Sequence, residues 1–124
     1  MRVTAQRVAI YDMLLGSNEH PTAAMIYDGL KKQYPTLSLM TVYNTLNRLV
    51  DAGVVNDLGT VGDGFTHYDA DISAHVNLAC TNCHQISDLA SEYTPTLGAD
   101  ILARSGYQIQ GSRLLYYGLC PSCQ

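Results

Sequence analysis

Two Cys-x-x-Cys pairs, Cys80 with Cys83 and Cys120 with Cys123, include every cysteine of this 124-residue chain. Two thiolates three residues apart can bind one ion from a tight turn, and a second such turn completes a tetrahedral zinc site. Residues 84–119 lie between the pairs, which is too long a segment for a compact zinc ribbon or finger. The spacing therefore predicts a structural zinc that joins two distant strand ends and attaches the C-terminus to a small domain.

The same cysteines could instead form two disulfides or a redox-active, thioredoxin-like pair. The chain opens with Met-Arg-Val-Thr-Ala, and this polar start predicts no signal peptide and gives no indication of an oxidising compartment. Cys80 ends a predicted strand and Cys120 follows one, so neither pair lies at the strand-to-helix turn that redox motifs use. These points favour zinc over both alternatives.

Composition limits the classes of function. A chain of 124 residues with 47% hydrophobic residues can form one ordinary domain or two very small ones. It has no apolar run long enough to span a membrane, which predicts a soluble, cytoplasmic protein without a membrane partner. The net charge of -4 argues against a broad non-specific polyanion binder but allows a local basic edge that contacts DNA.

The first half of the chain predicts helices. Apolar residues at helical spacing (Val8, Tyr11, Leu14 and Leu15) indicate a helix over residues 4–15. A second predicted helix follows the N-cap Thr22 and ends before residue 35, and a third follows the N-cap Ser38 and ends before residue 53.

Two predicted strands, 54–58 and 65–69, follow the helices and are joined by a glycine-rich tip. Helices followed by such a hairpin predict a winged helix, which lays its third helix in the major groove of DNA. On that helix Thr41 and Arg48 could bond phosphate, Asn44 or Asn47 could pair with an adenine edge, and Tyr43 could contact a thymine methyl. An ordinary amphipathic helix with a polar, solvent-facing side remains the alternative.

The second half, after residue 71, predicts strands over 75–79, 85–88 and 107–119 and a helix from Thr94-Pro95 to Gly106. A small α/β unit of this kind is near the lower size limit for independent folding, and zinc and dimerisation would supplement its core. The predicted fold class of the whole chain is therefore α+β.

Several segments together resemble the ferric uptake regulator superfamily, which consists of dimeric, metal-dependent bacterial transcription regulators. They are residues 2–7 (Arg-Val-Thr-Ala-Gln-Arg), 20–22 (His-Pro-Thr), 41–44 (Thr-Val-Tyr-Asn), 67–69 (His-Tyr-Asp), 75–80, Cys83 and 117–123. The resemblance implies a winged-helix DNA-binding domain over 1–70, a hinge near 70–73, and a homodimerisation and metal-binding domain over 71–124 with the four-cysteine zinc. It adds Arg7 to the residues expected to contact operator DNA.

Within this family the chain is most similar to the peroxide-stress repressors. The resemblance implies a regulatory metal site made of His20, Asp69, His75 and Asp88, with Asn77 at a fifth position where the pattern has histidine. Nitrogen and oxygen ligands without thiolate suit Mn²⁺ or Fe²⁺. Asp69 and Asp88, where iron-uptake members more often carry Glu, favour a peroxide sensor.

The resulting hypothesis is a repressor, not an enzyme, that binds operator DNA when Fe²⁺ or Mn²⁺ occupies the regulatory site. With Fe²⁺ bound, the resemblance implies that peroxide oxidises His20 or His75 and releases the DNA. A regulator that responds to iron, manganese or zinc without peroxide chemistry is the nearest alternative, and Asn77 keeps it open. A metal-dependent hydrolase and a zinc-stapled protein-interaction module are the other classes considered.

The remaining two histidines are not expected to bind metal. His67 is interpreted as a surface residue, and His84 is expected to be exposed and not to contact metal. Family members usually have another helix before the segment that begins at Arg2, so the start at Met1 indicates either a short member or a trimmed chain.

Overall fold

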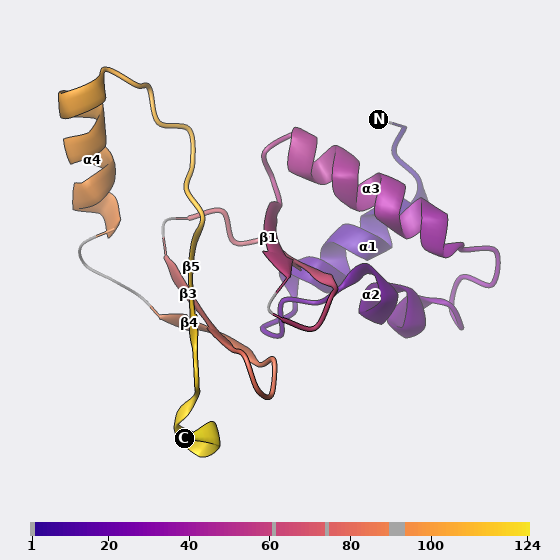
Figure 1. Cartoon of the computed structure of the whole chain (residues 1–124). Coiled ribbons are helices and arrows are strands. Elements are labelled where there is room, and N and C mark those ends of the chain that lie inside the picture. Colours follow the sequence, from indigo (N-terminus) through magenta and orange to yellow (C-terminus); the bar gives the residue numbers. More distant parts are fainter. Residues whose placement is uncertain (1, 61, 74, 90–93) are drawn as a thin grey trace.

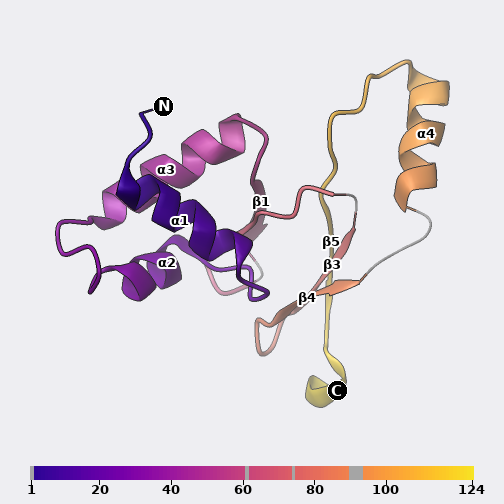
Figure 2. The ribbon, with the colours of Figure 1, turned by 180° about the vertical axis from the view of Figure 1, so that it is seen from behind.

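The computed structural model describes residues 2–60, 62–73, 75–89 and 94–124. Helices dominate the N-terminal part of the chain and strands the C-terminal part, and both views place α4 at the end of the molecule far from α1–α3 (Figures 1 and 2). In chain order the elements are α1 (Ala5–Leu15), α2 (Ala23–Leu30), α3 (Leu39–Asp51), β1 (Asn56–Thr60), β2 (Thr66–Asp69), β3 (Val76–Cys80), β4 (Ile86–Leu89), α4 (Thr94–Ser105), β5 (Leu114–Gly118) and the short 3-10 helix η1 (Pro121–Cys123).

Side-chain caps start the helices that carry the N-terminal part. The Thr22 hydroxyl accepts a hydrogen bond from the Met25 amide at 3.2 Å, and the Ser38 hydroxyl accepts one from the Thr41 amide at 3.1 Å. Each bond satisfies an amide that has no partner within its helix. Both predicted N-caps are therefore confirmed, and they set where α2 and α3 begin.

The helices α1, α2 and α3 enclose the main hydrophobic core. Ile10, Ile26 and Leu46 are completely buried there, and Tyr68 of β2 packs against the same core. Val8 and Leu15 lie outside this core, since their side chains are 46% and 54% exposed to solvent. The predicted apolar stripe of α1 was therefore partly wrong: Ile10 and Leu14, four residues apart, form the buried line instead.

The register of the second sheet brings the two cysteine pairs together. Its strand order is β4-β3-β5, with β4 antiparallel and β5 parallel to β3. The parallel pairing places Cys80, the last residue of β3, opposite Gly118, the last residue of β5. Because parallel strands end at the same edge of a sheet, both Cys-x-x-Cys turns leave the sheet at one place.

The last predicted strand is shorter than expected. The sequence predicted extended structure over 107–119, but β5 covers only Leu114–Gly118. Its partner β3 begins at Val76, opposite Leu114, and the described part of the chain offers residues 107–113 no neighbouring strand with which to pair. A mixed helix-and-strand fold is confirmed, while the winged-helix description and a domain boundary at residue 70 remain predictions. Among the helices of the described part, none is long and apolar enough to cross a membrane.

Candidate metal centres

The four cysteines form one compact cluster. Their sulfur atoms all lie within 4.8 Å of one another, and Cys83 Sγ is 3.9 Å from Cys120 Sγ. All four are free thiols, and their separation is well beyond the ~2.05 Å of a disulfide bond. Four sulfurs drawn from two turns are the donor set of a closed, tetrahedral zinc site.

Backbone amides and neighbouring sulfurs shift the pKa values of two cysteines in opposite directions. Amides of Cys120 and Cys83 donate to Cys80 Sγ at 3.4 and 3.5 Å and lower the pKa of the Cys80 thiol to about 5. A hydrogen bond from Asn82 favours the thiolate of Cys123, but the neighbouring sulfurs outweigh it and raise the pKa of that thiol to about 11. A cation bound among the sulfurs would offset the repulsion between neighbouring thiolates and allow all four cysteines to ionise.

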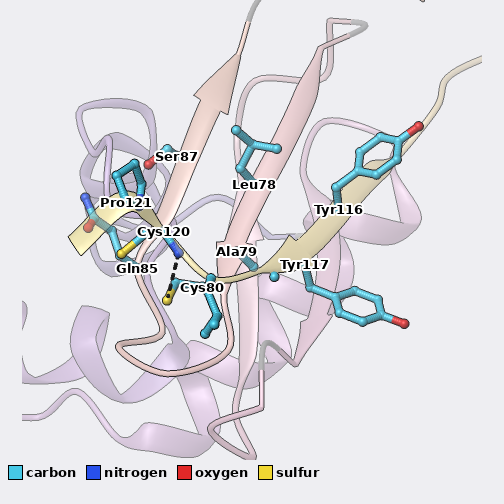
Figure 3. A pocket seen from close by; sticks show the side chains of 11 residues that line it. Leu78, Ala79, Cys80, Gln85, Ser87, Tyr116, Tyr117, Cys120 and Pro121 are labelled. Atoms are coloured by element: carbon cyan, nitrogen blue, oxygen red, sulfur yellow. Dashed lines mark hydrogen bonds between the residues drawn. The ribbon is translucent and has the colours of Figure 1, made fainter. Parts of the chain in front are cut away.

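A pocket of about 300 Å³ lies beside this cluster (Figure 3). Cys80 and Cys120 line it together with Leu78 of β3 and Tyr116 and Tyr117 of β5. Leu78 and Tyr116 are paired across the two strands and are 40% and 62% exposed, whereas Tyr117, the next residue of β5, projects to the other side of the sheet. Leu78 and Tyr116 therefore present an apolar face to solvent next to the cysteine cluster.

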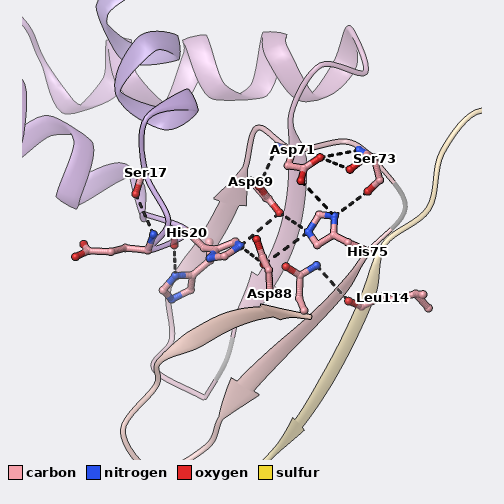
Figure 4. Close-up of polar contacts among 11 residues, drawn as sticks. Ser17, His20, Asp69, Asp71, Ser73, His75, Asp88 and Leu114 are labelled. Carbon is pink, nitrogen blue, oxygen red and sulfur yellow. Dashed lines mark hydrogen bonds and ion pairs between the residues drawn. The ribbon is translucent and has the colours of Figure 1, made fainter. Parts of the chain in front are cut away.

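A second cluster joins four distant parts of the chain (Figure 4). His20 precedes α2, Asp69 ends β2, His75 precedes β3, and Asp88 lies in β4. One ligand atom from each lies within 4.8 Å of the others. The structure thus brings together four of the five residues expected in the regulatory site, two from each half of the chain.

His20 is held in an unusual conformation at the centre of this cluster. Its φ of 53° is in the left-handed region, and the residue is only 3% exposed. Nε2 lies 2.7 Å from Asp88 Oδ1 and 3.4 Å from Asp69 Oδ2, yet neither ring nitrogen has a partner in hydrogen-bond geometry. Burial opposes a charge on the ring, but the two carboxylates outweigh it and raise the pKa of His20.

His75 presents a defined nitrogen to the cluster. Its Nδ1–H donates to the Ser73 carbonyl at 2.8 Å, which leaves Nε2 2.9 Å from Asp69 Oδ2. Burial opposes its charge, while the Ser73 carbonyl and the Asp69 carboxylate raise the pKa of His75. Burial also disfavours the Asp69 carboxylate, but contacts with His20 and the Asp71 amide lower the pKa of Asp69. Two imidazole rings facing carboxylates are an arrangement in which one divalent ion could take the place of any protons that the rings share with the carboxylates.

Asn77, the fifth expected residue, lies in β3 directly opposite Asp88 and is 2% exposed. Its Nδ2 donates to the Leu114 carbonyl of β5 at 3.2 Å. A carbonyl can only accept, so this bond fixes which arm of the amide is nitrogen. The other arm, Oδ1, is buried without a hydrogen-bond partner. An oxygen donor without a hydrogen-bond partner is therefore available on the residue that pairs with Asp88.

The structure corrects the expectations for the other two histidines. His67 is not a surface residue: it is 6% exposed, because residues 20–22 and the tip of the β1–β2 hairpin cover it. His84 is half-buried, not exposed, and has a φ of 64° in the turn that follows the first cysteine pair. The buried position of His67 depends on contacts between distant segments, which no local sequence signal could reveal.

The residues expected to contact DNA lie on one side of α3 and at the start of α1. Tyr43, Asn44 and Arg48 are exposed, whereas Val42 and Leu46 of the same helix are completely buried. Thr41 is half-buried against the cap of α3. Arg7 is also half-buried, and its guanidinium donates to the carbonyl of Arg2. The exposed side of α3 is thus free for a partner, while Thr41 and Arg7 already make contacts within the chain.

Comparisons with known proteins show the family to which the chain is related. The model of the ferric uptake regulator family matches residues 1–117. The chain is similar to the peroxide operon regulator of Bacillus subtilis (strain 168), with 36% identity over 99% of this chain and 84% of that protein.

Solved structures of similar proteins cover almost the whole chain. The Campylobacter jejuni peroxide stress regulator superposes with a TM-score of 0.82 at 29% identity and covers 95% of this chain and 88% of its own. PerR from Streptococcus pyogenes has a TM-score of 0.55 at 37% identity and covers 100% of this chain and 84% of its own. Of these two relatives, the one with the higher sequence identity therefore has the lower TM-score.

Proposed function

The chain belongs to the ferric uptake regulator family, and from this premise we propose that it is a metal-dependent repressor that binds operator DNA and senses peroxide. The observation that carries the proposal is the convergence of His20, Asp69, His75 and Asp88 from both halves of the chain. An ion held by such a cluster favours one arrangement of the two halves. The names of similar proteins, a peroxide operon regulator and a peroxide stress regulator, support the peroxide-sensing form.

The proposed regulatory site holds Fe²⁺ or Mn²⁺ through His20, Asp69, His75, Asn77 and Asp88. Two buried atoms without a hydrogen-bond partner support this donor set, Nε2 of His20, which lies against the carboxylates of Asp69 and Asp88, and Oδ1 of Asn77, because such atoms normally have one. Asp69 and His75 would keep their present contacts with the Asp71 amide and the Ser73 carbonyl, which orient both ligands.

When Fe²⁺ is bound, it would supply the chemistry by which peroxide is reduced and a neighbouring ligand is oxidised. His20 and His75 are the proposed targets, because their rings lie at this site. Oxidation of either ring would remove a nitrogen donor and weaken the link between the two halves. Loss of DNA would follow from the weaker metal binding.

The cysteine cluster is proposed to hold structural Zn²⁺ through Cys80, Cys83, Cys120 and Cys123. The ionised state favoured at Cys80 and the repulsion at Cys123 both support binding of a cation there. Zinc would attach the C-terminal end of the chain to β3, so that the sheet β4-β3-β5 stays intact. The exposed apolar face of β3 and β5 supports a homodimer formed by the domain of residues 71–124.

For DNA, we propose that residues 1–70 act as a winged helix with α3 in the major groove. Tyr43 and Asn44 would contact bases, and Arg7, Thr41 and Arg48 would contact the phosphate backbone. The exposure of Tyr43, Asn44 and Arg48 on one side of α3 supports this assignment. A homodimer would present two such helices to successive major grooves.

A second candidate is a regulator of the same family that responds to iron, manganese or zinc without oxidation. Asn77 favours it, because an amide oxygen in place of an imidazole weakens the attraction of the site for Fe²⁺ relative to Mn²⁺. The family consists of transcriptional regulators, so neither candidate includes catalytic turnover.

Peptide mass spectrometry of Fe²⁺-loaded protein after brief peroxide treatment tests the proposal, with Mn²⁺-loaded protein as the control. We expect added oxygen on His20 or His75 in the iron sample alone, and His84, outside the cluster, serves as an internal control. Gel retardation of a duplex selected from a randomised pool should be lost in parallel. If the histidines stay unmodified while iron is bound, the second candidate function remains. If the protein retards no duplex with any metal, both candidate functions are excluded.

A further inference from the structure

A buried histidine, His67, contacts the backbone of His20. His67 of β2 has a side chain that is 7% exposed, and it does not belong to either cluster of candidate ligands. Its Nδ1 lies 2.7 Å from the His20 carbonyl oxygen, and its Nε2 lies 2.7 Å from Asp63 Oδ2. Both ring nitrogens are therefore engaged, one by the backbone of a proposed ligand and one by the tip of a hairpin.

The contact with His20 supports a conformation that histidine seldom adopts. A φ of 53° brings the Cβ of a non-glycine residue into an unfavourable position, so such residues persist where neighbouring contacts hold them. Because a carbonyl can only accept, the bond is donated by His67 Nδ1–H. Next along the chain, the Tyr68 amide donates to the Pro21 carbonyl at 3.1 Å, and Thr22 forms a β-bridge with His67. The segment that carries His20 is thus attached to β2.

The contact with Asp63 fixes the orientation of the His67 ring. Asp63 lies between β1 and β2, and its Oδ1 accepts the Phe65 amide at 3.1 Å, which holds the carboxylate in the turn. Because Nε2 lies against that carboxylate, the ring cannot turn away from the His20 carbonyl without also leaving Asp63. The hairpin tip, His67 and the backbone of His20 therefore form one continuous chain of contacts.

We propose that His67 is a positioning residue of the regulatory metal site and that Asp63 holds it in place. This inference rests on the proposed function, since it assigns His20 as a ligand. Its consequence is that Asp63, which contacts no proposed ligand, influences metal affinity from the hairpin tip. Residues that orient metal ligands in this way change metal affinity by roughly 10- to 100-fold when they are removed.

Titration of the full chain with Mn²⁺, with free Mn²⁺ measured by electron paramagnetic resonance, tests the proposal. His67→Leu should lower Mn²⁺ affinity by roughly 10- to 100-fold, and Asp63→Ala should lower it by about tenfold. His67→Asn should recover most of the loss, because its amide can donate to the His20 carbonyl from the position of Nδ1. Asp57→Ala is the matched control: Asp57 Oδ1 also accepts a backbone amide two residues further on in the same hairpin, that of Gly59 in β1 at 2.8 Å, and lies outside the contacts that join His67 to His20.

Circular dichroism identifies which variants are folded, and Asp63→Ala decides the matter if His67→Leu does not fold. Unchanged Mn²⁺ affinity in the folded variant would overturn the proposal, as would a His67→Asn variant that binds as weakly as His67→Leu. Retardation of operator DNA by the wild type, measured on the same samples, separates the two proposals. A wild type that binds Mn²⁺ but no DNA would contradict the proposed function and leave the result on His67 standing.

Discussion

Asn77 determines which donor atom completes the proposed regulatory site. Its Oδ1 is buried without a partner, and the bond from Nδ2 to Leu114 prevents the amide from exchanging its two arms. With this oxygen the site offers two imidazole nitrogens and three oxygens. Oxygen-rich sites suit Mn²⁺, whereas each additional imidazole raises affinity for Zn²⁺ and Fe²⁺ more strongly.

Replacing Asn77 by histidine should therefore change metal preference. We expect Asn77→His to raise the affinity for Zn²⁺ relative to Mn²⁺ by about tenfold, or about 1.4 kcal/mol of binding free energy. Competition titrations on protein whose cysteine cluster is already loaded with zinc would measure the ratio. Asn47→His, which adds an imidazole on the exposed side of α3, is the control. An unchanged ratio would show that residue 77 does not supply a ligand.

At the scale of single residues, sequence reasoning found the members of the clusters but not what supports them. His20, Asp69, His75 and Asp88 were expected together, and the structure brings them together, although their role as ligands stays a prediction. His67 was interpreted wrongly, because its burial depends on residues 20–22 crossing over β2. A left-handed histidine before proline also gives no signal of its own in the sequence.

At the scale of elements, local signals and tertiary pairing account for different parts of the fold. Thr22 and Ser38 were identified as N-caps because a hydroxyl next to an apolar helical pattern is a local signal. The start of β5 was misplaced by several residues, because the length of a paired strand depends on its partner. Pairing of β3 with a strand from the end of the chain is a long-range property that local periodicity does not contain.

The cap of α3 gives a stability prediction. Ser38→Ala removes the hydroxyl that accepts the Thr41 amide, and we expect a loss of about 1 kcal/mol in the free energy of unfolding. Chemical denaturation of zinc-loaded protein, followed by circular dichroism, would measure it. Ser112→Ala, in an exposed segment outside helices and strands, is the control and should change stability by less than about 0.5 kcal/mol. Equal effects of the two changes would contradict the assigned cap.

At the scale of the whole molecule, the two clusters differ in what they join. The cysteines connect β3 with the C-terminal end of the chain, so a metal there would stabilise one half. The second cluster takes His20 and Asp69 from the first half and His75 and Asp88 from the second half. Residues 71–73 between the halves are exposed, and a movable connection there would explain why the relative with higher identity superposes less well.

Because an ion can shift the arrangement only through its differential affinity for the closed form, Mn²⁺ should change the shape of the molecule. We expect the radius of gyration measured by small-angle X-ray scattering to fall when Mn²⁺ is added to zinc-loaded protein, and to rise again when a mild chelator removes it. Asp88→Asn should keep the larger radius at the same Mn²⁺ concentration, since it weakens the link from β4 to His20. A wild-type radius that does not respond to Mn²⁺ would mean that the halves are held together without metal, and control of DNA binding would then have to arise within residues 1–70.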